Sequence, residues 1–219
     1  MCPLTLIARG DILTKKSSFS EVHLDALKEI SNIGMGNAVT SLAQLVNRRI
    51  EMNVPLTRFM PLEETISLVG GPEEIVSCVS LNISGDVPGM VLFIFDSQST
   101  FQIVDLLMGM NLGTTIDLDE MAESAVKEIG NVLTGSFIGA LCQMTQLNMV
   151  TAVPMFAFDM LGAILTSLMV ASGRVEEQVL VIQTQLFQEK EVNIKGHFFL
   201  LTEPGSIQVL LKALGLAVE

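Results

Sequence analysis

The sequence predicts an α+β fold in a single pseudo-twofold domain, with a β-sheet covered on one face by two long helices and shorter amphipathic helices. First, the stretches 24–56 and 123–155 align without gaps and agree even at polar positions. Second, 91–109 and 197–215 also align, each reading as an apolar strand, a turn and a short amphipathic helix. Third, the link between the halves, 110–119, is short, which favours one domain over two independent ones.

Each half is expected to begin with a long helix. Ser20 and Asp119 are predicted N-caps, because a short polar side chain there accepts a hydrogen bond from a free backbone amide. Acidic residues suit the positive end of the helix dipole in the first turn, where the sequence has Glu21, Glu120 and Glu123.

Strands are expected after each long helix, because runs rich in Ile, Val, Leu and Phe alternate with turns that contain Gly and Pro. The first strand of each half is predicted to end at a proline. With one long helix per half, the helices are expected to cover one face of the sheet. The further predicted strands are 66–70, 75–84, 87–95, 161–171, 175–186 and 191–201.

The predicted domain spans 21–219, with repeat 1 at about 21–112 and repeat 2 at about 119–215. Residues 1–20 lie outside both copies and are expected to form a loosely ordered lead-in. They lack the basic region and cleavage site of a secretion signal, so a cytoplasmic location is expected.

Composition disfavours several classes of partner and site. With 24 acidic and 12 basic residues the formal charge is −12, which argues against binding to nucleic acid or anionic lipid. No CxxC spacing occurs, so we expect free, buried or half-buried thiols in a reducing compartment. Neither a metal site nor a disulfide framework is expected from the scattered Cys2, Cys78, Cys142, His23 and His197.

The most hydrophobic stretch, 150–171, raises the hypothesis of a membrane span. Pro154 and Asp159 interrupt it and no basic residues flank it. Its beginning also aligns with the shorter stretch 54–62 of the first copy. Membrane insertion is therefore not expected.

The shared polar positions form a stripe on each long helix. In the first copy Asp25, Glu29, Asn32 and Gly36 follow one another at steps of four, three and four residues. At about 100° per residue these steps return to one helical face. We call these residues the first stripe, and their counterparts Ser124, Glu128, Asn131 and Gly135 the second stripe.

Each stripe combines a carboxylate and a carboxamide that reach outward with a glycine that leaves the backbone bare. Another protein could approach that backbone closely. A solvated helix face would also carry Glu and Asn, and recent duplication would preserve both. The copies have diverged at other polar positions, such as Thr40 and Gly139, yet they keep the stripes.

A proline follows each stripe at the same distance, Pro55 in the first copy and Pro154 in the second. From Asn32 the helix can continue for about 14 residues, roughly 21 Å, to the region of Asn47. A returning strand of about five or six residues covers roughly 17–20 Å. Each proline is therefore expected beside its asparagine, where it would brace the helix or the docking of a partner.

The chemistry open to the stripes is limited by what the sequence lacks. No Ser-His-Asp set, Cys-His pair, phosphate-binding loop or metal cluster is apparent. A carboxamide is a poor base, but it donates and accepts hydrogen bonds and can orient a water molecule. That suffices for an activated phosphoryl group, whose transfer depends mainly on positioning and charge stabilisation.

An aspartyl phosphate on another protein fits this chemistry, because that protein supplies both the activated bond and its own Mg²⁺. The asparagine would aim the water, and the glutamate would pair with a cation of the partner and set the register of docking. The predicted catalytic residues are Glu29, Asn32, Glu128 and Asn131, supported by Asp25, Pro55, Ser124 and Pro154, with Gly36 and Gly135 for close approach. No cofactor of the chain's own is expected.

The sequences of the two long helices resemble the signature helices of the CheC family of chemotaxis phosphatases, related to CheX and FliY. The matching runs are LKEISNIGMGNAVTSLAQLVNRRIEMNVP and VKEIGNVLTGSFIGALCQMTQLNMVTAVP, and the resemblance spans about residues 21–215. It implies an α+β pseudo-twofold fold and hydrolysis of the phosphoryl group on the response regulator CheY at two complete sites. It also implies the receptor deamidase CheD as a partner. One departure is Ser31, where the second copy has Gly130.

Two other functions fit the same residues. The chain could be a non-catalytic adaptor that binds CheD and CheY, or a component associated with the flagellar switch. The numerous methionines, such as Met108 and Met110, are expected to fill the core, although a docking groove lined by methionine is an alternative.

Overall fold

The computed structural model describes residues 20–172, 179–188 and 192–216. In chain order, the elements of the first half are α1 (Glu21–Val46), β1 (Glu51–Met60), α2 (Leu62–Val69), β2 (Ile75–Gly85), β3 (Gly89–Asp96) and α3 (Ser97–Leu107). Those of the second half are α4 (Glu120–Thr145), β4 (Met149–Thr151), β5 (Met155–Met160), α5 (Leu161–Ser172), β6 (Val179–Gln188), β7 (Val192–Thr202) and α6 (Ser206–Ala213). The predicted α+β class is confirmed.

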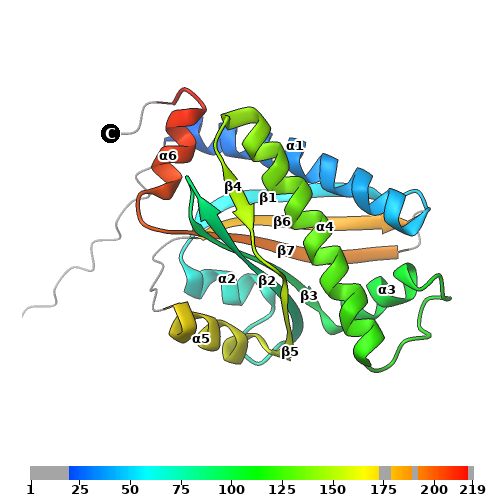
Figure 1. The fold of residues 1–219 in the computed structure, drawn as a ribbon. Helices are drawn as coiled ribbons and strands as arrows, with labels where there is room; N and C mark the ends of the chain where they lie inside the picture. The colour runs from blue at the N-terminus through cyan, green and yellow to red at the C-terminus, as the bar shows by residue number, and fades with distance from the viewer. Residues whose placement is uncertain (1–19, 173–178, 189–191, 217–219) are drawn as a thin grey trace, which may run out of the picture.

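The strands form one seven-stranded antiparallel sheet in the order β1-β6-β7-β3-β2, with β4 and β5 both paired to β2 (Figure 1). Each edge is thus built by the strand that follows a long helix, and the two central strands are those that precede α3 and α6. The halves exchange their edges, because β1 pairs with β6 of the second half and β5 with β2 of the first.

Helices cover both faces of this sheet, so the prediction that they cover one face is wrong. The larger core lies under α1, α3, α4 and α6, and a second core lies between the opposite face and α2 with α5 (Figure 1). Successive residues of β3 alternate between these cores, as the twofold repeat of a strand requires: Phe93 faces the first, and Leu92 and Ile94 face the second.

The helices α2 and α5 replace the strands predicted at 66–70 and 161–171. In α5 the apolar side chains that pack on the second core are spaced three and four residues apart, as on one face of a helix. They are Leu161, Ile164, Leu165 and Leu168. A short apolar run fits both the strand and the helix period, which is the usual ambiguity between a buried strand and a helix.

The other predicted strands correspond to β2, β3, β6 and β7, except that residues 175–178 and 191 lie outside the described residues. The lead-in also lies outside them, apart from Ser20. The hydrophobic stretch 150–171 is divided among β4, β5 and α5. Within the described residues, no helix has the length and apolar character needed to cross a membrane.

Both predicted N-caps are confirmed. Ser20 precedes α1, and its backbone N–H donates to Nδ1 of His23 at 3.1 Å. Asp119 precedes α4, and its Oδ1 accepts a hydrogen bond from the backbone N–H of Ala122 at 2.8 Å. The capping groups therefore define where both stripe-bearing helices begin.

The two long helices cross closely on the first face of the sheet. A Cβ atom on Gly34 would lie 2.6 Å from Cδ2 of Phe137, so only glycine lets this ring pack against α1. Near the crossing, Ser136 Oγ donates to Ser41 Oγ at 3.0 Å. These contacts set how α1 and α4 lie relative to each other.

Candidate functional site

The first stripe faces solvent along α1. Asp25, Glu29, Asn32 and Gly36 are all exposed, whereas Leu27 of the same helix is buried. The 4-3-4 spacing therefore places a carboxylate, a second carboxylate, a carboxamide and bare backbone in one line on the outer surface.

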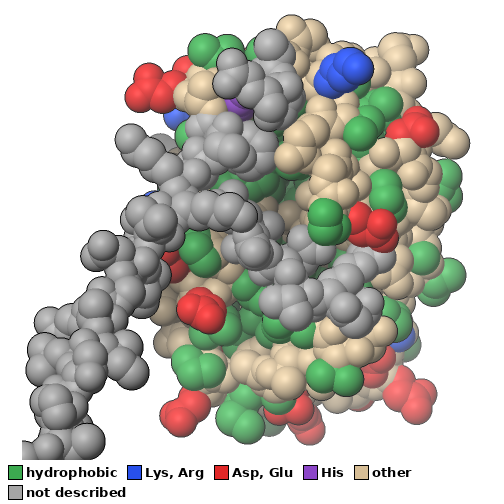
Figure 2. Space-filling model, turned by 90° about the vertical axis from the view of Figure 1, so that its left-hand side faces the viewer, with side chains coloured by type: hydrophobic (Ala, Val, Ile, Leu, Met, Phe, Trp, Pro, Cys, Tyr) green, Lys and Arg blue, Asp and Glu red, His purple; other side chains and the backbone are tan. Residues whose placement is uncertain are grey.

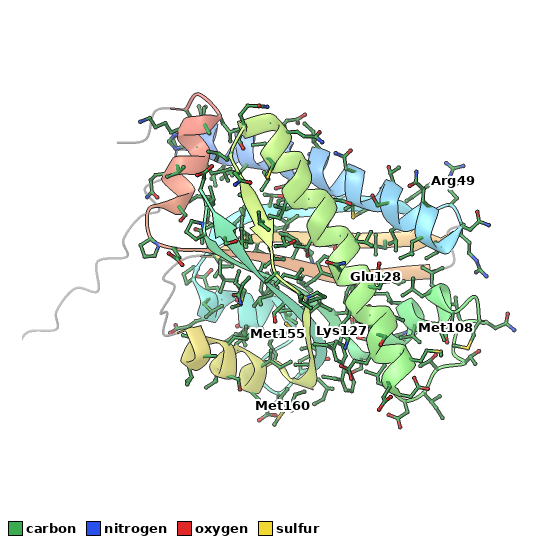
Figure 3. All side chains as sticks on the ribbon, in the orientation of Figure 1. Arg49, Met108, Lys127, Glu128, Met155 and Met160 are labelled. Atoms are coloured by element: carbon green, nitrogen blue, oxygen red, sulfur yellow. The ribbon has the colours of Figure 1, made fainter. Side chains whose placement is uncertain are left out.

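The second stripe is presented in the same way along α4. Ser124, Glu128, Asn131 and Gly135 are exposed, and Val126 is buried. Figure 3 shows Glu128 on the part of α4 that lies over the sheet. The two stripes differ at their first polar position, where Asp25 carries a charge and Ser124 does not.

Both stripes belong to one helical layer. In Figure 1 α1 and α4 cross over the same face of the sheet and run in roughly opposite directions. In each helix the glutamate and asparagine come before the crossing point in the sequence. Because the helices run in opposite directions, the two pairs lie on opposite sides of that point. This arrangement offers two separate surfaces rather than one composite site.

The reactive side chains of the stripes are available to a partner. Within the described part of the chain, the side chains of Glu29, Asn32, Glu128 and Asn131 have no hydrogen bond or ion pair. The nearby Lys127 is paired instead with Glu123, with 3.1 Å between Nζ and Oε1 (Figure 3 labels Lys127). This pair leaves the neighbouring Glu128 carboxylate free.

The residue that departs from the repeat pattern is accommodated locally. Ser31 is buried, and its hydroxyl donates to the backbone carbonyl of Leu27 at 2.6 Å. At the matching position on α4, a Cβ atom on Gly130 would lie 2.5 Å from Cγ1 of Val79. Each helix thus carries the residue that its own packing admits, on the side away from its stripe.

The prolines mark irregularities in the two edges of the sheet. Between the pairs Asn53↔Gln185 and Leu56↔Gln183 the register of β1 shifts, and Pro55 lies in this bulge. Proline has no backbone N–H to donate, so an edge strand with a bulge suits it. Contrary to the prediction, β1 continues beyond Pro55 to Met60.

Pro154 occupies the corresponding place in the second half. It lies in the gap between β4 and β5, where pairing to β2 moves from Ile83↔Thr151 to Ser80↔Met155. The helix lengths assumed in the geometric prediction are confirmed at Val46 and Thr145. That the prolines brace the stripes remains a prediction.

A buried carboxylate that sequence reasoning missed organises the linker before α4. Asp105 is fully buried and accepts hydrogen bonds from the backbone N–H groups of Gly113, Thr114 and Thr115 and from the Thr115 hydroxyl, at 2.6–3.1 Å. Burial raises the pKa of this carboxyl, but the Thr115 hydroxyl and the three amides outweigh it and hold the pKa below its usual value. The signal was a lone aspartate on the apolar face of α3, followed by a loop rich in Gly and Thr.

Other reactive side chains lie away from the stripes and are held neutral. Burial raises the pKa of the Cys78 thiol to about 12 and lowers the pKa of His197 to about 4. The prediction of free thiols is confirmed for buried Cys78 and half-buried Cys142, and Cys2 lies outside the described residues. The described residues contain no cluster suited to a metal ion.

The charge on the surface agrees with the acidic composition. Figure 2 shows one face of the molecule, on which separate Asp and Glu side chains outnumber Lys and Arg. On that face the few basic side chains lie apart from one another.

Comparison with known proteins connects these two helices to one family. The family model described as CheC-like matches residues 22–57, and the model described as chemotaxis phosphatase CheX matches residues 77–174. The CheY-P phosphatase CheC of Bacillus subtilis is 33% identical over 91% of this chain and 97% of its own length.

A second curated relative matches in sequence, and a solved structure matches in fold. The flagellar motor switch phosphatase FliY of Bacillus subtilis is 30% identical over 53% of this chain, which matches 30% of FliY. The crystal structure of Thermotoga maritima FliY superposes with a TM-score of 0.76 over 90% of this chain and 98% of that one, at 22% identity, and so shows the same fold. Sequence identity over nearly the whole of both chains establishes that the chain belongs to the CheC-like family.

Proposed function

We propose that this chain is an aspartyl-phosphate phosphatase that hydrolyses the phosphoryl group of the chemotaxis response regulator CheY. The observation that carries the proposal is the pair of exposed stripes, each with an unpaired glutamate and asparagine at identical spacing. The 33% identity to a CheY-P phosphatase over almost the whole chain supports the same substrate.

Asn32 and Asn131 act by positioning water. Each carboxamide is exposed, so it can enter the active site of a docked partner and accept a hydrogen bond from a water molecule. The carboxamide holds the water in line with the phosphorus. The entropy cost of ordering the water is then met on docking and no longer adds to the reaction barrier. The proton released by the water passes to a phosphoryl oxygen or to solvent, because a carboxamide is too weak a base to accept it.

Glu29 and Glu128 fix the register of the docked partner. An exposed carboxylate one helical turn before the asparagine can pair with a cation beside the partner's phosphorylated aspartate. Asp25 would add a further charge to the first stripe, and Ser124 a hydrogen bond to the second.

No cofactor of the chain's own takes part in the proposed reaction. The Mg²⁺ that neutralises the phosphoryl oxygens belongs to the response regulator, as phosphoryl transfer in general requires such a charge. The proposal also includes CheD as a second partner, a cytoplasmic location, and an internal duplication as the origin of the two stripes.

The test is the lifetime of the phosphoryl group on CheY, followed as phosphate release from labelled CheY with and without this protein. Substoichiometric amounts are expected to shorten the half-life, because each molecule turns over many substrates. An adaptor that only binds CheY would leave the half-life unchanged at every concentration. A structural part of the flagellar switch would instead co-purify with switch components and release no phosphate.

A further inference from the structure

Glycine in the exposed middle of a long helix needs an explanation, because it weakens the helix relative to alanine. The two stripe-bearing helices contain such a residue at the same position, Gly36 in α1 and Gly135 in α4. Neither has the positive φ that would demand glycine. The reason for glycine at these positions must therefore lie in how closely other atoms approach the Cα atom.

Packing within the molecule does not require either glycine. A Cβ atom built on Gly36 or on Gly135 meets no other atom within 4 Å. Gly34 and Gly130 of the same helices are different, since a Cβ there would lie 2.6 Å from Phe137 and 2.5 Å from Val79. The fold thus accounts for Gly34 and Gly130 but not for the two glycines on the stripes. Gly139 also lacks a packing reason, but only the stripe glycines recur at the same position in both helices.

We propose that Gly36 and Gly135 are specificity-determining residues, at which the phosphorylated response regulator lies directly against the helix backbone. This inference rests on the proposed function. Each glycine follows its asparagine by one helical turn, which separates neighbouring positions on a helix face by about 5–6 Å. A carboxamide can enter a pocket of the partner only if the adjoining turn comes into contact with the partner's surface. A methyl group there would hold the two surfaces apart.

On α1, the region without side chains ends one turn further along the helix. The next position is Thr40 on α1 and Gly139 on α4. Thr40 already carries a Cβ atom, and its hydroxyl donates to the backbone carbonyl of Gly36 at 3.0 Å. A side chain is therefore tolerated at this position in one stripe-bearing helix. Gly139, whose Cβ would also meet nothing within 4 Å, provides a matched control.

The experiment uses the full chain with one stripe disabled at a time. Gly36→Ala is placed in an Asn131→Ala background, and Gly135→Ala and Gly139→Ala are each placed in an Asn32→Ala background. Each variant is assayed for melting temperature, for KM and kcat on phosphorylated CheY, and for Kd with phosphorylated CheY.

All three alanines are expected to raise the Tm by roughly 2–4 °C, because alanine favours the helix. Gly36→Ala and Gly135→Ala should nevertheless raise KM and Kd by about tenfold or more, with kcat little changed, as one misplaced methyl group can do in a close contact. Gly139→Ala should stabilise the protein without changing KM or Kd.

Unchanged KM and Kd in both stripe variants would overturn the inference while leaving a phosphatase intact. A chain that fails to release phosphate in any form would instead refute the proposed function. In that case Kd alone decides, and equal Kd values for the glycine and alanine forms would overturn this inference as well. A rise in KM for Gly139→Ala equal to that for Gly135→Ala would also contradict it.

Discussion

Glu29 and Asn32 lie on one exposed face of α1, and Glu128 and Asn131 lie on the corresponding face of α4. Steps of four, three and four residues return to one face of any α-helix, so Glu29 and Asn32 had to share a face once the helix formed. Exposure of that face also followed from the sequence, because the intervening Leu27 and Ile30 supply the buried side. The register of a helix is a local property and can be read without knowing the fold.

Replacing the glutamates tests their proposed role in docking. Glu29→Ala and Glu128→Ala, each in a background where the other stripe is disabled, should raise KM for phosphorylated CheY about fivefold and change kcat less. An exposed ion pair contributes up to about 1 kcal/mol, and its loss affects ground and transition states alike. The KM of the variants should also depend less on salt.

Glu64→Ala is the matched control for net charge, because Glu64 is equally exposed but lies on α2, on the other face of the sheet. Its KM should equal that of the unmodified chain. A drop in kcat for Glu29→Ala or Glu128→Ala at unchanged KM would place the carboxylate in the chemical step and contradict the docking role.

At the scale of single elements, the sequence predicted the starts of the long helices, which depend on local contacts, but not the type of the short apolar elements. Ser20 and Asp119 marked the starts of the long helices, because their side chains act on the nearest backbone amides. The short apolar runs that became α2 and α5 could not be assigned by pattern alone. Their helical form depends on packing against a sheet face that the sequence did not reveal.

The ends of the long helices store strain that the sequence did not show. Asn47 and Gln146 follow α1 and α4 with φ of 50° and 58°, and they are the non-glycine residues with positive φ among those described. A left-handed conformation is unfavourable for most side chains, and asparagine tolerates it better than glutamine. Glycine is the usual residue at this position of a helix end.

Gln146→Gly should therefore increase the free energy of unfolding by about 0.5–1 kcal/mol, measured by urea denaturation. Asn47→Gly should give a smaller gain. As a control, Gln44→Gly at an exposed, right-handed position in the last turn of α1 should lower stability, by up to about 1 kcal/mol. A loss of stability on Gln146→Gly would show that the side chain, whose Nε2 donates to the carbonyl of Gln143, matters more than the backbone strain.

For the whole molecule, the order of strands in the sheet could not be predicted from the sequence. The repeated pattern predicted most elements of each half, apart from α2 and α5, but nothing in it specifies that β1 pairs with β6 and β5 with β2. Strand pairing depends on contacts between residues far apart in the chain. The same holds for the crossing of α1 over α4, which depends on Phe137 packing against Gly34.

This arrangement has a consequence for function. Since the two stripes lie on oppositely directed helices of one layer, each has its own surface for a partner (Figure 1). Both asparagines are exposed and neither is part of the core. The molecule thus presents two separate exposed stripes of similar composition.

The most direct measurement is the rate of phosphate release from phosphorylated CheY by Asn32→Ala, Asn131→Ala and the double variant. Each single substitution should lower kcat only in part, because the other stripe remains. The double substitution should lower kcat by about 10²-fold or more, as the loss of other hydrogen-bonding groups that act in the transition state does. The Tm should stay unchanged, since both side chains are exposed. A folded double variant that releases phosphate at the original rate would contradict the account.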